Sequence, residues 1–95
     1  MDVEDVFCSR VRMKILKILA QLGELNISEI TRRLGVNYQT TVEHLDVLEA
    51  ESILQHKTFG RMRLYRINAR SPKARAIQAL LDAWKEPEIK NERLS

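Results

Sequence analysis

The sequence predicts a mainly α-helical domain that also contains a small β-hairpin, which is an α+β fold class. Two observations support this prediction. Apolar residues recur every three or four positions in four segments, 3–22, 27–34, 38–52 and 71–86, which is the period of an amphipathic helix. Between the last two segments, two runs of alternating character flank Gly60-Arg61, a pattern typical of two strands joined by a tight turn.

The length and composition of the chain indicate one small globular domain. Its 95 residues are 44% apolar and 31% charged, which is too apolar for intrinsic disorder. We expect this domain over residues 1–87 and a polar tail over 88–95. No apolar run reaches the roughly 18–20 residues that cross a bilayer, and the start of the chain is acidic where a secretory signal is basic. We therefore expect a cytoplasmic protein with no membrane partner.

The first helical segment ends at Gly23, and its apolar positions are Cys8, Val11, Ile15, Ile18 and Leu22. Ser9 is suited to cap the main part of this helix, which leaves residues 2–8 as a short lead-in turn or helix.

Two further helices are joined by a very short link. Asn26 precedes Glu29 by three residues, a variant of the capping box that starts a helix, and Gly35 suits a left-handed stop. Asn37 is a second N-cap and opens a helix over about 38–52. Because only Gly-Val-Asn separates the two helices, they must meet at a sharp corner, and we predict a helix-turn-helix over about 26–52.

The rest of the chain predicts a hairpin over about 53–68 and a last helix over about 71–86. Ser71-Pro72 supplies an N-cap and a proline in the first turn, and Pro87 stops the helix. The apolar stripe along this helix is expected to find no further layer within the chain and to pair with a second copy. The predicted dimer interface comprises Cys8, Val11, Ile15, Ala74, Ile77, Leu81 and Trp84.

Three helices followed by a β-hairpin form a winged helix-turn-helix, in which the third helix lies in the major groove of DNA. The start of that helix is rich in hydrogen-bonding side chains, while Leu45 and Leu48 supply apolar anchors on the opposite face. Gln39 can pair with adenine, and Thr40 can reach a phosphate or a thymine methyl group. The predicted DNA-contacting residues are Arg32, Arg33, Asn37, Tyr38, Gln39, Thr40, Glu43, His44, Lys57, Arg61 and Arg63.

Charge placement supports an anionic partner. The net charge is only +3, but residues 52–81 contain seven basic residues and no acidic one. A basic hairpin tip at Arg61 suits the minor groove or its phosphates. Charge on an exposed hairpin has a second explanation, because it also protects the edge strand from pairing with another chain. Tyr38 also has two possible roles: it can stack on the DNA backbone or pack beneath its own helix. The remaining basic residues are expected to form a solvated surface: Arg66, Arg70, Lys73 and Arg75.

Three runs together resemble winged-helix regulators of the ArsR type, particularly the archaeal members. Ser9–Leu19 resembles the opening helix, Ile27–Glu49 the helix-turn-helix and Phe59–Ile67 the wing. The resemblance covers about residues 9–68. It implies a homodimeric, sequence-specific transcription regulator whose outer helices form the dimer interface.

The sequence departs from the metal-sensing members of that family, which use clusters of Cys, His and carboxylate ligands. Its one cysteine is Cys8, and its two histidines, His44 and His56, fall on the recognition helix and the wing. We therefore expect no metal and no other cofactor. Cys8 is either a small buried apolar residue or the partner of Cys8 in a second copy, as an interchain disulfide.

Two other functions remain open from the sequence alone: a protein-interaction winged helix and a non-specific DNA-compacting protein. The first favours apolar rather than basic residues on the wing, and the second predicts binding with little sequence preference. The chain has no Gly-rich phosphate loop, no metal-ligand spacing and no recognisable nucleophile-base motif, so we predict that it is not an enzyme.

Overall fold

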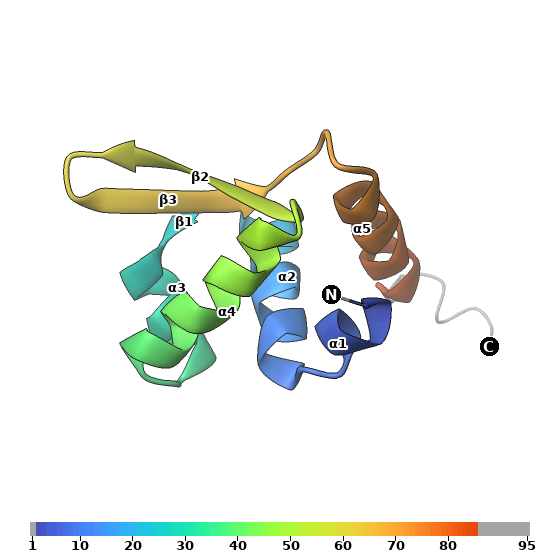
Figure 1. Ribbon diagram of the computed structural model, residues 1–95, viewed down its shortest axis with the longest axis horizontal. Coiled ribbons are helices and arrows are strands. Elements are labelled where there is room, and N and C mark those ends of the chain that lie inside the picture. Colours follow the sequence, from blue (N-terminus) through green and yellow to red (C-terminus); the bar gives the residue numbers. More distant parts are fainter. Residues whose placement is uncertain (1, 86–95) are drawn as a thin grey trace, which may run out of the picture.

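The computed structural model describes residues 2–85, and five helices and a small sheet make up this part of the chain (Figure 1). The helices are α1 (Val3–Phe7), α2 (Arg10–Leu22), α3 (Ile27–Leu34), α4 (Tyr38–Ala50) and α5 (Pro72–Trp84), and the strands are β1 (Leu25–Asn26), β2 (Leu54–Phe59) and β3 (Met62–Ile67). The predicted α+β class is confirmed. The predicted stop at Pro87 and the tail over 88–95 lie outside the described residues.

Polar caps start the main helices where the sequence predicts them. Ser9 Oγ accepts from the backbone N–H of Arg12 at 3.1 Å, which separates the first segment into α1 and α2. Asn26, Asn37 and Ser71 cap α3, α4 and α5 in the same way. Gly35 ends α3 with a left-handed φ of 74°, so the chain turns sharply into α4.

Helix α4 ends two residues before its predicted end. Ser52 adopts a left-handed φ of 64°, a geometry that costs a non-glycine residue about 1–2 kcal/mol. Two backbone bonds oppose this cost, because Ser52 N–H donates to Glu49 and Ile53 N–H donates to Leu48 at 2.9 and 3.0 Å. The chain therefore leaves the helix directly into β2.

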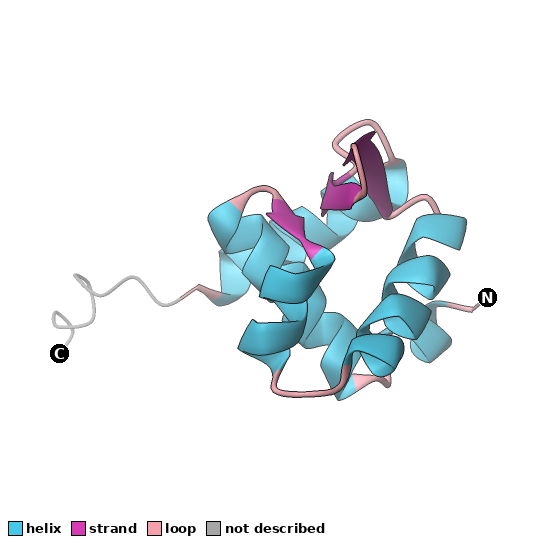
Figure 2. Ribbon diagram, turned by 90° about the vertical axis from the view of Figure 1, so that its left-hand side faces the viewer, coloured by secondary structure: helices cyan, strands magenta, loops and turns pink. Residues whose placement is uncertain are grey.

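The sheet has three antiparallel strands in the order β1-β3-β2. Strands β2 and β3 pair from Leu54–Ile67 at the base to Phe59–Met62 at the tip, so the hairpin and its turn at residues 60–61 are confirmed. Strand β1 was not predicted, because two residues are too few to show alternation. It pairs only with Leu64 and Tyr65. The strands lie together at one edge of the helices (Figure 2), and the hairpin tip extends beyond the helices (Figure 1).

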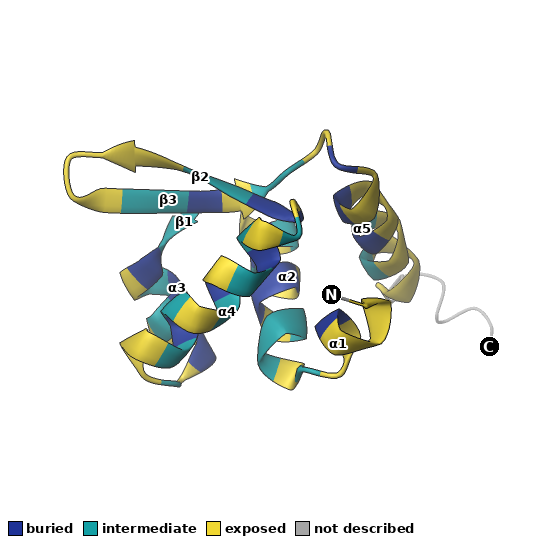
Figure 3. Cartoon of the chain, viewed as in Figure 1, coloured by how far each residue is buried: buried dark blue, intermediate teal, exposed yellow. Residues whose placement is uncertain are grey.

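The core lies where α2 meets the helix-turn-helix, α5 and the base of the hairpin. Its largest fully buried side chains include Leu16 of α2, Ile30 of α3, Leu45 of α4 and Tyr65 of β3. Figure 3 shows buried residues in dark blue on the helices and at the base of the hairpin, whereas the hairpin tip is exposed. Burying each large apolar side chain stabilises the fold by roughly 1.5–3 kcal/mol, so this core holds α4 firmly in place.

Three residues of the predicted dimer interface are buried within one protomer. Helix α5 packs against α2 of its own chain, and Ala74 and Ile77 are 0% and 6% exposed. Ile15 is also fully buried. These three residues belong to the core of one protomer: Ile15 lies on α2 itself, and α2 packs against the helix that carries Ala74 and Ile77.

Cys8 is also placed differently from the prediction. It is exposed and ends α1, whereas the apolar stripe of α2 begins after the Ser9 cap. Its Sγ atom lies 3.7 Å from the carbonyl oxygen of Asp5. Cys8 is therefore not a buried apolar residue, and it does not share a helical face with Val11 and Ile15.

Candidate nucleic-acid interface

One face of α4 points away from the core. Thr41, Leu45 and Leu48 are buried, and the 3.6-residue period therefore turns Gln39 and Glu43 outward, where both are exposed. Gln39 Nε2 donates to Glu43 Oε2 at 3.3 Å. This face can present amide and carboxylate groups to a partner.

The beginning of α4 is also accessible. Tyr38 is 53% exposed, so its ring does not pack beneath the helix. Asn37 Oδ1 accepts from the Thr40 N–H at 2.8 Å, so the cap occupies that oxygen and leaves the amide NH₂ group as the available donor. Thr40 is half-buried beside it.

His44 lies at the side of α4 rather than on its outer face. Its Nδ1 atom lies 3.1 Å from Nη1 of Arg12, a residue of α2. Burial lowers the pKa of His44, the Arg12 guanidinium lowers it further, and Glu43 opposes them. The recognition helix is thus joined to the start of α2 by a contact that the sequence did not predict.

Arg32 and Arg33 share one carboxylate at the end of α3. Both pair with Glu29, and the Arg33 Nη2 atom lies 3.5 Å from Oε2. Two arginines on one glutamate leave a net positive charge, and a cation in the last turn also suits the helix dipole.

A polar cluster joins α4 to the base of the hairpin. His56 Nδ1 lies 2.7 Å from Glu49 Oε2, and the His56 ring lies 5.0 Å from the ring of Tyr65. Arg63 donates to the Tyr65 hydroxyl at 3.0 Å, so this predicted DNA contact is partly engaged within the fold. Burial raises the pKa of Tyr65, whereas the positive charge of Arg63 acts to lower it.

The sequence analysis missed Glu49 and Tyr65 as members of this cluster. The signal for Tyr65 was available, because pairing Phe59 with Met62 across the predicted turn also sets His56 opposite Tyr65. Glu49 comes from another element, and no local pattern connects it with the hairpin.

The hairpin tip carries accessible positive charge. Arg61 is exposed and forms no ion pair among residues 2–85. Lys57 lies 3.7 Å from Glu24 Oε2 and 5.5 Å from the centre of the Phe59 ring. Phe59 and Met62 are 55% and 43% exposed, so the tip is both basic and partly apolar.

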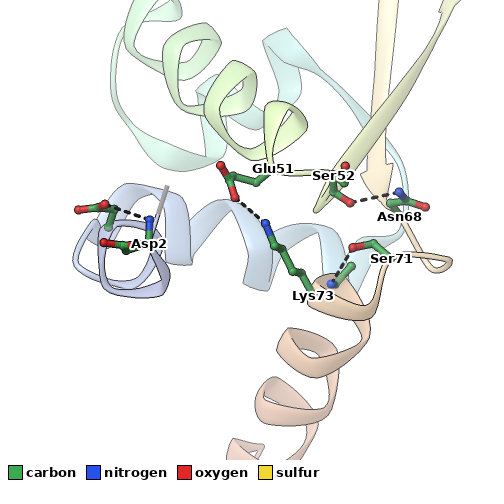
Figure 4. Close-up of polar contacts among 8 residues, drawn as sticks. Asp2, Glu51, Ser52, Asn68, Ser71 and Lys73 are labelled. Atoms are coloured by element: carbon green, nitrogen blue, oxygen red, sulfur yellow. Dashed lines mark hydrogen bonds and ion pairs between the residues drawn. The ribbon is translucent and has the colours of Figure 1, made fainter.

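The basic residues at the start of α5 have structural contacts instead, and Figure 4 shows the one between Lys73 and Glu51. Lys73 Nζ bonds Glu51 Oε1 at 2.7 Å, and this bond lowers the pKa of Glu51. Arg75 donates to the carbonyl groups of Ala69 and Arg70. The Lys73 bond ties α5 to the end of α4, and the Arg75 bonds tie α5 to the segment before it.

Within residues 2–85, no three His, Cys, Asp or Glu side chains lie close enough together to hold a metal ion. No helix in the same range has both the length and the apolar character needed to span a membrane.

The helix-turn-helix and its flanks match a known family. Residues 9–55 match the family described as "Bacterial regulatory protein, arsR family". This stretch of the chain is similar to the helix-turn-helix of that family. A comparison with curated protein sequences finds no match.

Solved structures share this fold over most of the chain. The homodimeric winged helix-turn-helix DNA-binding domain of a possible ArsR-family regulator from Mycobacterium bovis is 25% identical, with a TM-score of 0.71 over 98% of this chain and 79% of that one. The transcriptional repressor PagR of Bacillus anthracis is 27% identical, with a TM-score of 0.68 over 82% of this chain and 86% of that one. HlyU from Vibrio cholerae is 21% identical, with a TM-score of 0.74 over 86% of each chain. The winged helix-turn-helix architecture is therefore confirmed.

Proposed function

We propose that this protein is a homodimeric transcription regulator of the ArsR type that binds specific sites in double-stranded DNA in the cytoplasm. In this proposal α4 enters the major groove, and the hairpin contacts the backbone or the minor groove. The main support is the exposed outer face of α4 together with an exposed Arg61 at the hairpin tip that forms no ion pair within residues 2–85. The Mycobacterium bovis relative, described as a homodimeric DNA-binding domain, supports the same assignment.

The proposed contacts differ in how they become available. Gln39 and Arg61 are exposed and can meet DNA without a change in the fold. Arg32 and Arg63 would exchange an internal hydrogen bond for one to a phosphate. Arg33 and Lys57 would exchange an internal ion pair for one with a phosphate. The other proposed contacts are Asn37, Tyr38, Thr40, Glu43 and His44.

Acidic side chains on α4 favour a selective regulator over a non-specific DNA-compacting protein. Glu43 and Asp46 are exposed on or beside the proposed reading face, where they repel phosphate. Binding then depends on a base sequence that offsets this repulsion. Such a requirement favours discrimination among sites.

Exposed apolar residues on α1 and α5 supply a surface for the proposed dimer. Val3 and Phe7 are exposed on α1, and Leu80 and Trp84 on α5. A groove of about 540 Å³ lies between α2 and α5, with Met13, Leu81 and Trp84 among its lining residues. The proposed interface therefore retains Cys8, Val11, Leu81 and Trp84 from the sequence prediction.

A two-fold dimer presents its two recognition helices to successive major grooves, about 34 Å apart, on a pseudo-palindromic site. The disulfide between two copies of Cys8 stays a prediction. Non-reducing gel electrophoresis after mild oxidation tests it, and a monomer band alone contradicts it.

Selection of bound duplexes from a random pool at physiological salt tests the proposed function. We expect an inverted repeat whose half-sites are about 10–10.5 base pairs apart from centre to centre. Equal recovery of all sequences would instead support non-specific compaction. No recovery of DNA would overturn the proposal and leave a protein-interaction module as the better assignment.

A further inference from the structure

The guanidinium group of Arg12 connects three helices. Its Nη1 atom lies 3.1 Å from Nδ1 of His44 on α4, and its Nη2 atom donates to the backbone carbonyl of Asp5 on α1 at 2.6 Å. Its Nε atom is buried and has no partner within the described part of the chain. The Arg12 side chain is therefore held between α1 and the recognition helix.

The position of Arg12 in its own helix does not explain this arrangement. Arg12 lies in the first turn of α2, where no acidic residue is present and the helix dipole disfavours a cation. Asp5 lies in the last turn of α1, where backbone carbonyl groups lack intrahelical partners and attract a cation. The contacts of Arg12 with α1 and α4 offset its unfavourable place in α2.

The chemistry of the two side chains determines which atom of His44 carries the hydrogen. A guanidinium group has only N–H donors and does not lose its proton in proteins. The Nδ1 atom of His44 must therefore accept through its lone pair, and the ring is neutral with hydrogen on Nε2. The lowered pKa of His44 agrees with a neutral ring.

The charged groups around His44 are few. Arg12 faces it from α2, and Glu43 faces it from α4 itself, whereas α1 contributes the Asp5 carbonyl that orients Arg12. The Nε2 atom has no hydrogen-bond partner among residues 2–85 and is not one of their buried unpartnered atoms. This N–H group is free to meet a ligand at the side of the recognition helix.

We propose that Arg12 is a positioning residue that makes His44 a hydrogen-bond donor toward DNA. This inference rests on the proposed function and adds a rule of specificity to it. The Nε2–H group pairs with an acceptor, either a base acceptor in the major groove or a phosphate oxygen, and it does not pair with the amino group of cytosine, which is itself a donor.

The first test needs no DNA. In nitrogen-15 NMR spectra of the free protein above neutral pH, His44 is expected to give the pattern of the Nε2–H tautomer. The variant Arg12→Met is expected to lose this bias, and Arg12→Lys, which keeps a donor, to retain part of it. His56 is the internal reference, because its ring contacts Glu49 and not Arg12. An Nδ1–H tautomer in the wild type, or an unchanged tautomer in Arg12→Met, would overturn the proposal.

The second test uses the duplex obtained by selection. Base acceptors are removed one position at a time with 7-deazapurines, 2-aminopurine and 4-thiothymine, and phosphate charges with methylphosphonates. One substitution is expected to weaken wild-type binding up to about tenfold and to leave Arg12→Met binding nearly unchanged. The position that responds identifies the acceptor as a base or a phosphate.

If every substitution weakens both proteins equally, Arg12 has only a structural role and the proposal fails. If Arg12→Met does not fold, Arg12→Lys carries the same comparison and is expected to show an intermediate response. If selection recovers no DNA at all, the proposed function fails together with the donor role of His44. The NMR test alone then decides whether Arg12 sets the tautomer.

Discussion

The Nδ1 atom of His56 lies 2.7 Å from the Oε2 atom of Glu49, so the base of the hairpin is bonded directly to the recognition helix. Both side chains are largely shielded from solvent, with about a quarter and a third of their surface exposed (26% and 33%). This contact joins the two elements that are proposed to bind DNA.

Replacing Glu49 with alanine is expected to weaken the attachment of the hairpin to α4. Loss of the bond to His56 should lower the free energy of unfolding by about 1 kcal/mol and speed amide hydrogen exchange in β2 and β3. Urea unfolding and exchange measured by NMR check these outcomes. Glu43→Ala removes the same charge from an exposed site on α4 and serves as control. Equal exchange rates in the two variants would show that Glu49 does not hold the hairpin.

The variants Ile77→Ala and Trp84→Ala are expected to distinguish the buried face of α5, which stabilises the fold, from the exposed face, which is proposed to form the dimer. Ile77 is buried, and its truncation should destabilise the protein by about 2–4 kcal/mol. Trp84 is 81% exposed, so Trp84→Ala should leave unfolding of the protomer nearly unchanged and weaken self-association. Urea unfolding and sedimentation equilibrium measure the two effects. Unchanged self-association in Trp84→Ala would remove this residue from the interface.

The stability of the protein is expected to fall at acid pH through His44. Burial and the Arg12 guanidinium hold the pKa of His44 below its model-compound value of 6.5, against Glu43. The unfolded chain therefore binds a proton at this site more readily than the folded protein does. His44 contributes stability that is present above pH 6.5 and is lost as the pH falls through the lower folded-state value.

Urea unfolding from pH 7.5 to 5.5 can test this dependence against the variant His44→Gln, which does not titrate. The wild type should lose more stability than the variant over this range. The other titrating groups are present in both proteins, so the difference between them belongs to His44. Parallel pH profiles would contradict the assignment.

Replacing Arg61 with alanine is expected to weaken DNA binding broadly. Arg61 has no ion pair among the described residues, so a phosphate contact would depend directly on its charge. The slope of log affinity against log salt should become shallower by about one unit. Arg70→Ala removes the same charge in the segment before α5, at the other end of the hairpin, and should change the slope less. Indistinguishable slopes for the two variants would show that the hairpin tip makes no phosphate contact.

Local sequence signals predicted most of the fold but not its long-range contacts. Caps such as Asn37 and the turn at Gly60 depend on a few neighbouring residues, so their positions could be read from the chain. The stripe containing Ile77 showed that α5 has an apolar face, but periodicity does not say whether the same chain or a partner covers it. The contact between Arg12 and His44 joins residues 32 positions apart, and no local pattern pairs them.

The hairpin is anchored unevenly along its length. Leu54 and Tyr65 fix its root in the core, β1 supports β3 only at Leu64 and Tyr65, and the tip beyond them is a two-stranded ribbon. The hairpin is therefore held firmly at its base, and its tip can bend more easily. In the proposed complex with DNA, bending of the tip would let the hairpin follow grooves of different width while α4 stays in the major groove.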